Sequence, residues 1–116
     1  MSESPPLLVA CLCAEWCGSC RDYHAVFESL AAKAPPGTRF HWIDIEDEAD
    51  LADGIEVENF PSLLIARGDE VLFIGPVTPH ANAAAALIER AFAGKLDVVA
   101  HESARRLARA VAGAQT

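Results

Sequence analysis

Basic residues are scarce in this chain, and several features that mark common protein classes are missing. The 116 residues include 9 Lys and Arg against 17 Asp and Glu, which gives a formal net charge of −8. A nucleic-acid-binding protein needs a basic face, so this balance argues against that class. The sequence also has no internal repeats and no glycine-rich nucleotide loop. We therefore expect one acidic globular domain over residues 1–116.

The N-terminus lacks the features of an exported or membrane-anchored chain. It carries Glu3 but no Lys or Arg before the first apolar run, so a positively charged signal region is missing. The run itself, Leu7–Ala14, is eight residues long and too short to cross a membrane. We therefore expect a cytoplasmic monomer that contacts neither membrane nor nucleic acid, with mostly reduced cysteines. An exported protein whose signal has been removed is the alternative.

The cysteines are few and confined to one short stretch. All four lie between Cys11 and Cys20, and Cys17 and Cys20 form a C-x-x-C motif. The motif follows an apolar run that predicts a buried strand, and it precedes Arg21–Lys33, whose apolar residues recur with helical spacing. The N–H groups at that helix terminus would stabilise a thiolate at Cys17, and Cys20 lies one turn further along. This geometry favours a disulfide that is made and broken.

Zinc and iron–sulfur sites use the same cysteine spacing. Such sites need a second ligand pair, and neither another C-x-x-C nor a histidine pair follows downstream. The other two cysteines, Cys11 and Cys13, fall in the predicted strand and share one of its faces. We expect both to be buried structural thiols, and we expect no metal. A metal or cluster protein that uses all four cysteines is the weakest alternative.

The remaining apolar runs predict the other strands of an α/β domain. The run Thr38–Ile45 predicts a second strand. One of its faces would carry Phe40, Trp42 and Asp44, and the other His41, Ile43 and Ile45. Two further runs, Ser62–Ala66 and Val71–Ile74, predict a hairpin with its turn at Gly68.

Helices are expected between and after these strands. Glu46–Asp53 is acidic and predicts a short helix, whose first-turn acids complement the helix dipole. The pair Thr78-Pro79 begins a helix, and Gly94 fits its C-terminal cap. Residues 97–116 predict a weakly amphipathic helical extension, packed on its own domain or presented to a partner. Residues 1–6 are expected to be flexible.

Three motifs, in this order, resemble the thioredoxin superfamily. The segment Trp16–Cys20 (WCGSC) is similar to the family's active-site segment. The segment Phe60–Ile65 is similar to a second family segment, which carries a cis-proline beside the disulfide. Gly68–Glu70 resembles the turn before the family's last strand. The resemblance runs from about residue 7 to residue 92. It implies a minimal thioredoxin-like fold with a four-stranded sheet in the order second, first, third, fourth. It also implies that the third and fourth strands are antiparallel to the rest.

The resemblance implies a thiol–disulfide oxidoreductase that acts on protein disulfides, most simply as a reductant. Cys17 would attack the substrate disulfide, and Cys20 would resolve the mixed disulfide. The redox centre would be the Cys17–Cys20 disulfide with no bound cofactor, recharged by a thioredoxin-reductase-like protein or another thiol reductant. The substrate would dock on residues beside this centre, namely Trp16, Gly18, Ser19, Phe60, Pro61 and Gly75. The Phe60–Pro61 bond is expected to be cis. The alternative is a non-catalytic or redox-sensing module that binds a partner.

The chain departs from the family at positions that handle protons. The family buries an acid six residues before the first motif cysteine, where this sequence has Cys11, and the lysine that pairs with the acid is replaced by Trp42. A buried thiol does not readily accept a proton at neutral pH, so we expect slower attack by Cys20. His24, one turn past Cys20, is the other possible modulator of proton transfer, although a histidine with no such role is the simpler interpretation.

Overall fold

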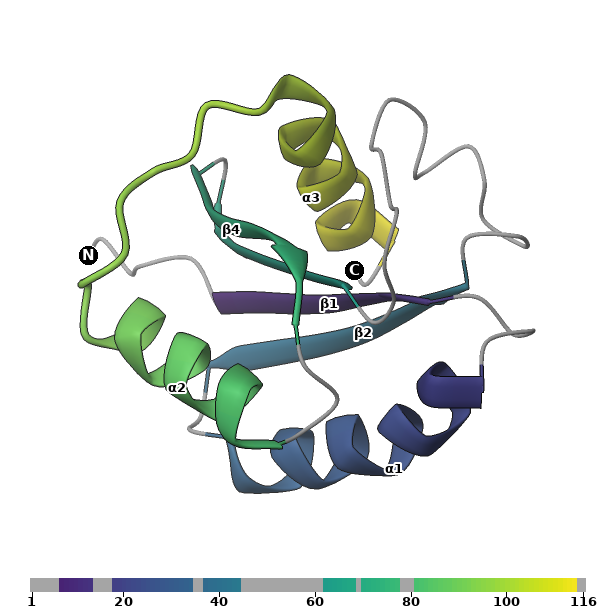
Figure 1. Ribbon diagram of the computed structural model, residues 1–116. Helices are drawn as coiled ribbons and strands as arrows, with labels where there is room; N and C mark the ends of the chain where they lie inside the picture. Colours follow the sequence, from purple (N-terminus) through teal and green to yellow (C-terminus); the bar gives the residue numbers. More distant parts are fainter. Residues whose placement is uncertain are drawn as a thin grey trace.

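The strands that the structure describes form a single mixed sheet. The computed structural model describes residues 7–13, 18–34, 37–44, 62–68, 70–77 and 81–114. Within these ranges the elements are, in chain order, β1 (Leu7–Cys13), α1 (Gly18–Lys33), β2 (Thr38–Asp44), β3 (Ser62–Arg67), β4 (Glu70–Pro76), α2 (Ala81–Phe92) and α3 (Glu102–Ala114) (Figure 1). The fold is an α/β thioredoxin-like fold, as the sequence predicted.

The strand order is β2-β1-β3-β4, which confirms the predicted order. Strands β1 and β2 are parallel, whereas β1 and β3 are antiparallel, and so are β3 and β4. The predicted direction of the fourth strand was wrong. Because the β3–β4 hairpin reverses the chain once more, β4 runs parallel to β1 and β2, and β3 alone runs against them.

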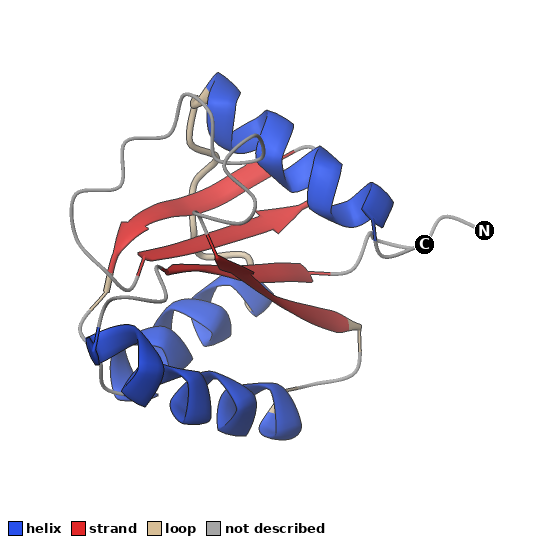
Figure 2. Cartoon of the chain, turned by 90° about the vertical axis from the view of Figure 1, so that its right-hand side faces the viewer, coloured by secondary structure: helices blue, strands red, loops and turns tan. Residues whose placement is uncertain are grey.

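Helices cover both faces of the sheet. Figure 2 shows the strands as a middle layer, with α1 and α2 on one side and α3 on the other. The even-numbered and odd-numbered residues of β1 enter two separate hydrophobic clusters, one against each helical layer. All seven residues of β1 are therefore buried, which explains why its sequence is continuously apolar rather than alternating.

Helix α1 begins at Gly18, three residues before the predicted start, and ends at Lys33 as predicted. Tyr23 and Phe27 are buried on its inner face, and Phe27 packs edge-to-face on Phe40 of β2. Ala31 belongs to the predicted apolar stripe but is exposed.

Helix α2 ends as its glycine predicted. Gly94 has a φ of 72°, and its N–H donates to the Ala91 carbonyl at 3.1 Å. The next N–H, of Lys95, donates to the Arg90 carbonyl at 2.9 Å. These two bonds form a Schellman cap, which satisfies the last carbonyls of the helix and needs a residue that tolerates positive φ.

Helix α3 packs on its own domain, which confirms the first of the two predicted roles of the extension. Its apolar face joins the sheet residues of the second cluster, and Leu107 and Val111 are fully buried there. Val98 and Val99 fall within the predicted helical extension 97–116, but they precede the helix and are 57% and 38% exposed. His101 caps the helix: its Nδ1 accepts the Ala104 N–H at 3.1 Å.

Several predictions fall outside the described residues. They are the flexible N-terminus 1–6, the acidic helix 46–53, the Phe60–Pro61 bond and the helix start at Thr78-Pro79. Among the helices that are described, none is long and apolar enough to cross a membrane.

Candidate active site

The cysteine motif lies where β1 leads into α1. Strand β1 ends at Cys13, and α1 begins at Gly18, so Cys20 falls in the first turn of the helix. The predicted strand and helix on either side of the motif are therefore confirmed. Trp16 and Cys17 lie outside the described residues, as do the side chains of Ser19 and Cys20.

One row of residues crosses the sheet near the motif. Cys11 of β1 pairs with Trp42 on one side and with Leu63 on the other, and Leu63 pairs in turn with Gly75 of β4. Gly75, a predicted docking residue, therefore lies in the same row as Cys11. A Cβ atom at Gly75 would come no closer than 3.6 Å to another side chain, that of Phe73, which is an ordinary contact. The described surroundings therefore leave room for a methyl group at this glycine.

The two strand cysteines form a buried sulfur pair. Cys11 and Cys13 are 0% and 1% exposed, and their Sγ atoms are 3.8 Å apart. The predicted burial and shared face are confirmed. The structure corrects the expectation of two thiols, because Cys11 is free but Cys13 is disulfide-bonded. A sulfur in a disulfide has no proton to donate, so Cys11 is the donor in the contact between them.

Burial raises the pKa of the Cys11 thiol from 9.0 to about 12. Cys11 therefore remains protonated at neutral pH and cannot serve as a base there, as the sequence comparison anticipated.

Tyr23 is a polar neighbour that the sequence did not single out. Burial raises its pKa from 10.0 to about 12, and the negative charge of an ionised Cys11 adds to the shift. Its hydroxyl is buried, and the described residues give it no hydrogen-bond partner. The only sequence signal was a tyrosine in an otherwise apolar helical stripe.

His24 lies on the flank of α1, half exposed. Its Nδ1 is 3.0 Å from Oε1 of Glu28, one turn along the helix. Its ring stands edge-on to Trp42, with the two centroids 4.6 Å apart. His24 is therefore held beside Trp42, the cross-strand neighbour of Cys11, and any role in proton transfer remains a prediction.

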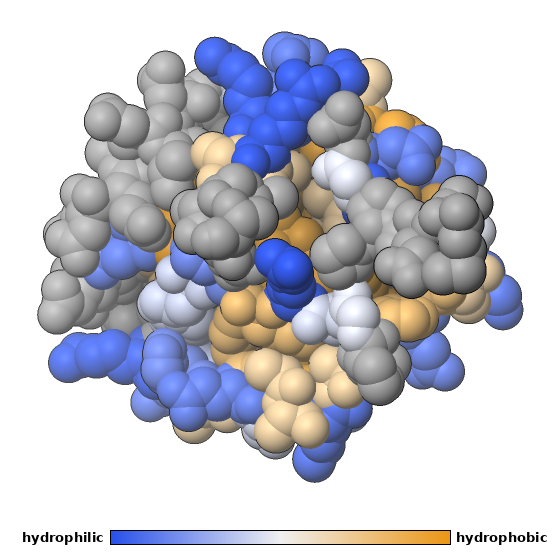
Figure 3. Space-filling model, turned by 180° about the vertical axis from the view of Figure 1, so that it is seen from behind, coloured by the Kyte–Doolittle hydropathy of each residue, from blue (hydrophilic) through white to orange (hydrophobic). Residues whose placement is uncertain are grey.

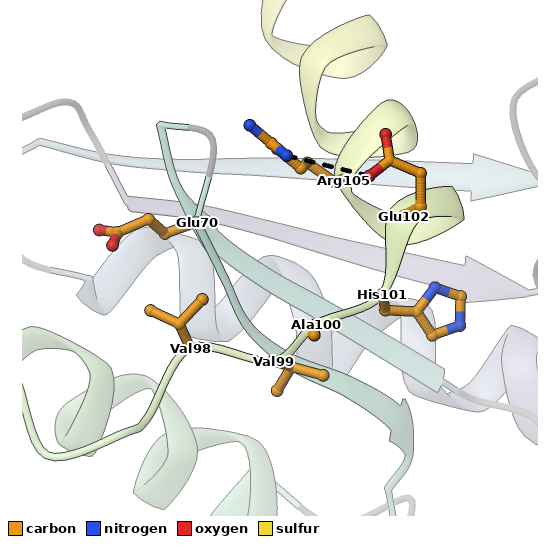
Figure 4. A pocket seen from close by; sticks show the side chains of 7 residues that line it. All are labelled: Glu70, Val98, Val99, Ala100, His101, Glu102 and Arg105. Atoms are coloured by element: carbon orange, nitrogen blue, oxygen red, sulfur yellow. Dashed lines mark ion pairs between the residues drawn. The ribbon is translucent and has the colours of Figure 1, made fainter.

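A surface pocket lies at the other end of the sheet. Seven residues of β4, α3 and the segment between α2 and α3 line it, and its volume is about 490 Å³: Glu70, Val98, Val99, Ala100, His101, Glu102 and Arg105 (Figure 4). Glu70 pairs with Arg67, and Arg67 pairs with Leu7, the first residue of β1. The pocket therefore lies at the end of the sheet where β1 begins. The cysteine motif follows Cys13, at the opposite end of β1. The pocket is therefore separate from the cysteine motif. Seen from behind, hydrophobic residues gather around the middle of the face, where they border one strongly hydrophilic group, and further hydrophilic residues lie at the upper and lower edges (Figure 3).

Comparisons with known proteins agree with this fold. A family model described as Thioredoxin matches residues 1–102, so the match ends where α3 begins. The putative thioredoxin 2 of Streptomyces coelicolor is 36% identical over 63 residues, which are 54% of this chain and 46% of that protein. The chain spans about half the length of the curated relatives it matches.

Solved structures of thioredoxins are also similar. A mutant thioredoxin from Halobacterium salinarum NRC-1 is 25% identical with a TM-score of 0.63, and the match covers 80% of this chain and 77% of that one. A structure of thioredoxin f2 in complex with ferredoxin:thioredoxin reductase matches with a TM-score of 0.67 at 20% identity, covering 76% of this chain and 79% of that one. Since the family model spans most of the sequence and the described fold is the one its members share, this chain belongs to the thioredoxin family.

Proposed function

We propose that this protein is a thiol–disulfide oxidoreductase that reduces protein disulfides through Cys17 and Cys20. Its family is typically one of thiol–disulfide oxidoreductases. The observation that carries the proposal is that α1 starts at Gly18, directly after Cys17 in the sequence. A thiol at a helix N-terminus faces unsatisfied N–H groups and the positive end of the helix dipole, both of which favour its thiolate.

The reaction consists of two exchanges. The Cys17 thiolate attacks one sulfur of the substrate disulfide, forms a mixed disulfide and releases the other substrate sulfur as a thiolate, which takes up a proton. The Cys20 thiol then loses its proton and attacks the Cys17 sulfur, which releases the second substrate thiol. An external dithiol returns the two electrons to the Cys17–Cys20 disulfide.

The proton of Cys20 needs an acceptor other than the residue at the family's acid position. That position holds Cys11, whose pKa of about 12 keeps it protonated. We propose water or His24 as the acceptor, since His24 lies on the same helix one turn past Cys20. We therefore expect the second exchange, rather than the first, to limit turnover.

Protein disulfides are the proposed substrates, and a thioredoxin-reductase-like protein or another thiol is the proposed reductant. A structurally similar thioredoxin has been crystallised with a ferredoxin:thioredoxin reductase, which supports a protein reductant of that general kind. The proposed docking surface lies beside the motif and includes Trp16, Phe60, Pro61 and Gly75.

Reduction of insulin disulfides with a coupled reductant tests the proposal. The parent should turn over, whereas Cys17→Ser should be inactive because it lacks the attacking thiol. Cys20→Ser should capture substrate as a mixed disulfide more readily than Cys17→Ser does. Ala25→Ser, an exposed change on the same helix, is the matched control and should behave like the parent. An inactive parent that still undergoes reversible oxidation would favour the alternative, a redox-sensing module that binds a partner. The replacement of the family's buried acid by Cys11 also suggests that alternative.

A further inference from the structure

Strands β2 and β4 form the two edges of the sheet, and they are not equally covered. At the β4 edge the Val99 N–H, from the segment before α3, donates to the Val71 carbonyl. In the middle of β2, the described residues beyond β1 supply no such backbone bond to Phe40 or Trp42. An edge strand presents a row of N–H and C=O groups that can pair with a further strand.

The ladder with β1 shows which backbone groups of β2 point outward. Leu7 pairs with Thr38, and the Leu7 N–H donates to the Gly37 carbonyl at 2.9 Å. In a parallel ladder a residue bonds to the two neighbours of its partner, so the odd-numbered residues of β2 bond to β1. The N–H and C=O groups of Phe40 and Trp42 therefore point away from β1, toward the edge.

We propose that β2 pairs with β2 of a second copy of this chain, antiparallel and about a two-fold axis beside His41. The two four-stranded sheets would then join into one. This inference goes beyond the proposed function and does not depend on it. It also replaces the monomer that was expected from the sequence.

The register centred on His41 pairs the strand along its whole length. Phe40 lies opposite Trp42 of the second copy, and the two exchange both of their outward hydrogen bonds. The two-fold axis repeats this pair on the other side of His41. Thr38 lies opposite Asp44 of the second copy, at each end of the paired strands. A shift of two residues in either direction would leave part of the strand without a partner.

Aromatic side chains favour this register. Phe40 and Trp42 lie on the side of the sheet that α1 covers, and both rings stand edge-on to Phe27. Opposite residues of an antiparallel pair share one face, so each of the two rings would lie beside a ring of the second copy. Cross-strand aromatic pairs stabilise a sheet, and here the symmetry supplies two of them.

The charges of β2 also permit self-association. Two chains with a formal net charge of −8 repel each other overall. The strand itself carries one charge of each sign, Arg39 and Asp44. In the proposed register Arg39 lies opposite Ile43 and Asp44 lies opposite Thr38, so no like charges of Arg39 or Asp44 oppose each other. The second copy therefore meets a locally neutral stretch of an acidic chain.

Sedimentation equilibrium of the full-length protein tests the association without a substrate. The protein is studied from micromolar to millimolar concentration in reducing buffer, which prevents disulfide-linked dimers. We expect the mass to rise from one chain to two and no further, because a two-fold axis closes the assembly. A mass of one chain throughout would overturn the proposal, since a segment of the same chain or solvent would then occupy the edge. A mass beyond two chains would overturn it as well.

Substitutions at Thr38 test the register. Thr38→Asp places a like charge opposite Asp44 at both ends of the paired strands, whereas Thr38→Lys places an opposite charge there. The dissociation constant of the dimer should be about tenfold higher for Thr38→Asp than for Thr38→Lys. Adding Asp44→Lys to Thr38→Asp should restore association. The matched pair Ala85→Asp and Ala85→Lys, exposed on α2, makes the same changes in net charge and should show no such difference. Equal constants for the two Thr38 variants would overturn the proposal.

A crosslink at the two-fold axis locates the contact. In this register the Cα atoms of the two His41 residues are about 4.5 Å apart, a distance that a disulfide can bridge. Oxidised His41→Cys should therefore form a dimer linked through the two introduced cysteines, as peptide mapping would show. Arg39→Cys is the control, because its two copies would be about 13 Å apart. Failure of His41→Cys to link, or equal linking by Arg39→Cys, would overturn the register. The mass of the parent decides the association even if a variant fails to fold.

Discussion

The Cys11→Asp substitution places a carboxyl group in the interior of the domain. Position 11 is fully buried, and its cross-strand neighbours are Trp42 and Leu63, neither of which carries a charge. Burial without a cation disfavours the ionised form, so the pKa of the new carboxyl should be raised above its value in the unfolded chain. The substitution restores the family's acid but lacks the family's lysine partner.

The expected loss of stability follows from the raised pKa of the buried carboxyl. The pKa of a fully buried carboxyl rises by about 3 to 5, and each unit corresponds to about 1.36 kcal/mol. At neutral pH the folded protein holds the proton that the unfolded chain has released, so the variant should lose about 4 kcal/mol. This loss of stability is absent below the pKa that the carboxyl has in the unfolded chain. Above that pKa it grows by about 1.4 kcal/mol per pH unit, until the carboxyl ionises in the folded protein as well. The parent thiol, with a pKa of about 12, adds no such slope near neutral pH.

Urea unfolding under reducing conditions measures this slope. Between about pH 5.5 and about pH 7, the stability of Cys11→Asp relative to the parent should fall by a further ~2 kcal/mol. Cys11→Ala is the matched control, since it loses packing but adds no titrating group, and its loss should be the same at both pH values. An equal loss for Cys11→Asp at both values would refute the reasoning. It would mean that the carboxyl reaches water or accepts a hydrogen bond from the Tyr23 hydroxyl, which has no partner among the described residues.

Three further predictions concern position 11, the proposed docking residue Gly75 and the N-terminal cap of α3. Cys11→Asp should speed the decay of a preformed mixed disulfide relative to Cys11→Ala, by up to about 10²–10⁴-fold where proton transfer limits the rate. Stopped flow measures this decay, and equal rates would show that the side chain at position 11 contributes only to packing. Gly75→Ala should change the stability by less than about 0.5 kcal/mol but raise KM for a protein disulfide, and an unchanged KM would remove Gly75 from the docking surface. His101→Ala should cost about 1 kcal/mol in urea unfolding while His101→Asn recovers most of it, and equal losses would show that the side-chain acceptor does not cap α3.

Most of the architecture was predictable because local patterns determine it. The unbroken apolar run of β1 matches a strand covered by helices on both faces, and the stripe of Tyr23 and Phe27 matches the buried side of α1. Gly94 could be identified as a helix end because the positive φ of a Schellman cap favours glycine. These features depend on residues close in the sequence.

The features that were missed depend on contacts between distant elements. The row that joins Cys11 to Gly75 is set by the register of two strand pairs, β1 with β3 and β3 with β4, which no single strand encodes. The disulfide of Cys13 depends on how closely two sulfurs approach in space, and residue spacing does not determine that distance. The direction of β4 could have been predicted, since a tight hairpin always reverses the chain.

Strand β4 forms one edge of the sheet, and within the described part of the chain one backbone hydrogen bond from outside the sheet covers part of that edge. The Val99 N–H, in the segment before α3, donates to the Val71 carbonyl at 2.7 Å. The helix that follows covers the apolar residues of β1, β3 and β4 on the same side. Detachment or cleavage of the chain before Glu102 would therefore uncover an apolar sheet face and an unpaired strand edge together, which is the combination that promotes strand-to-strand aggregation. The last helix thus protects the solubility of the domain as well as its fold.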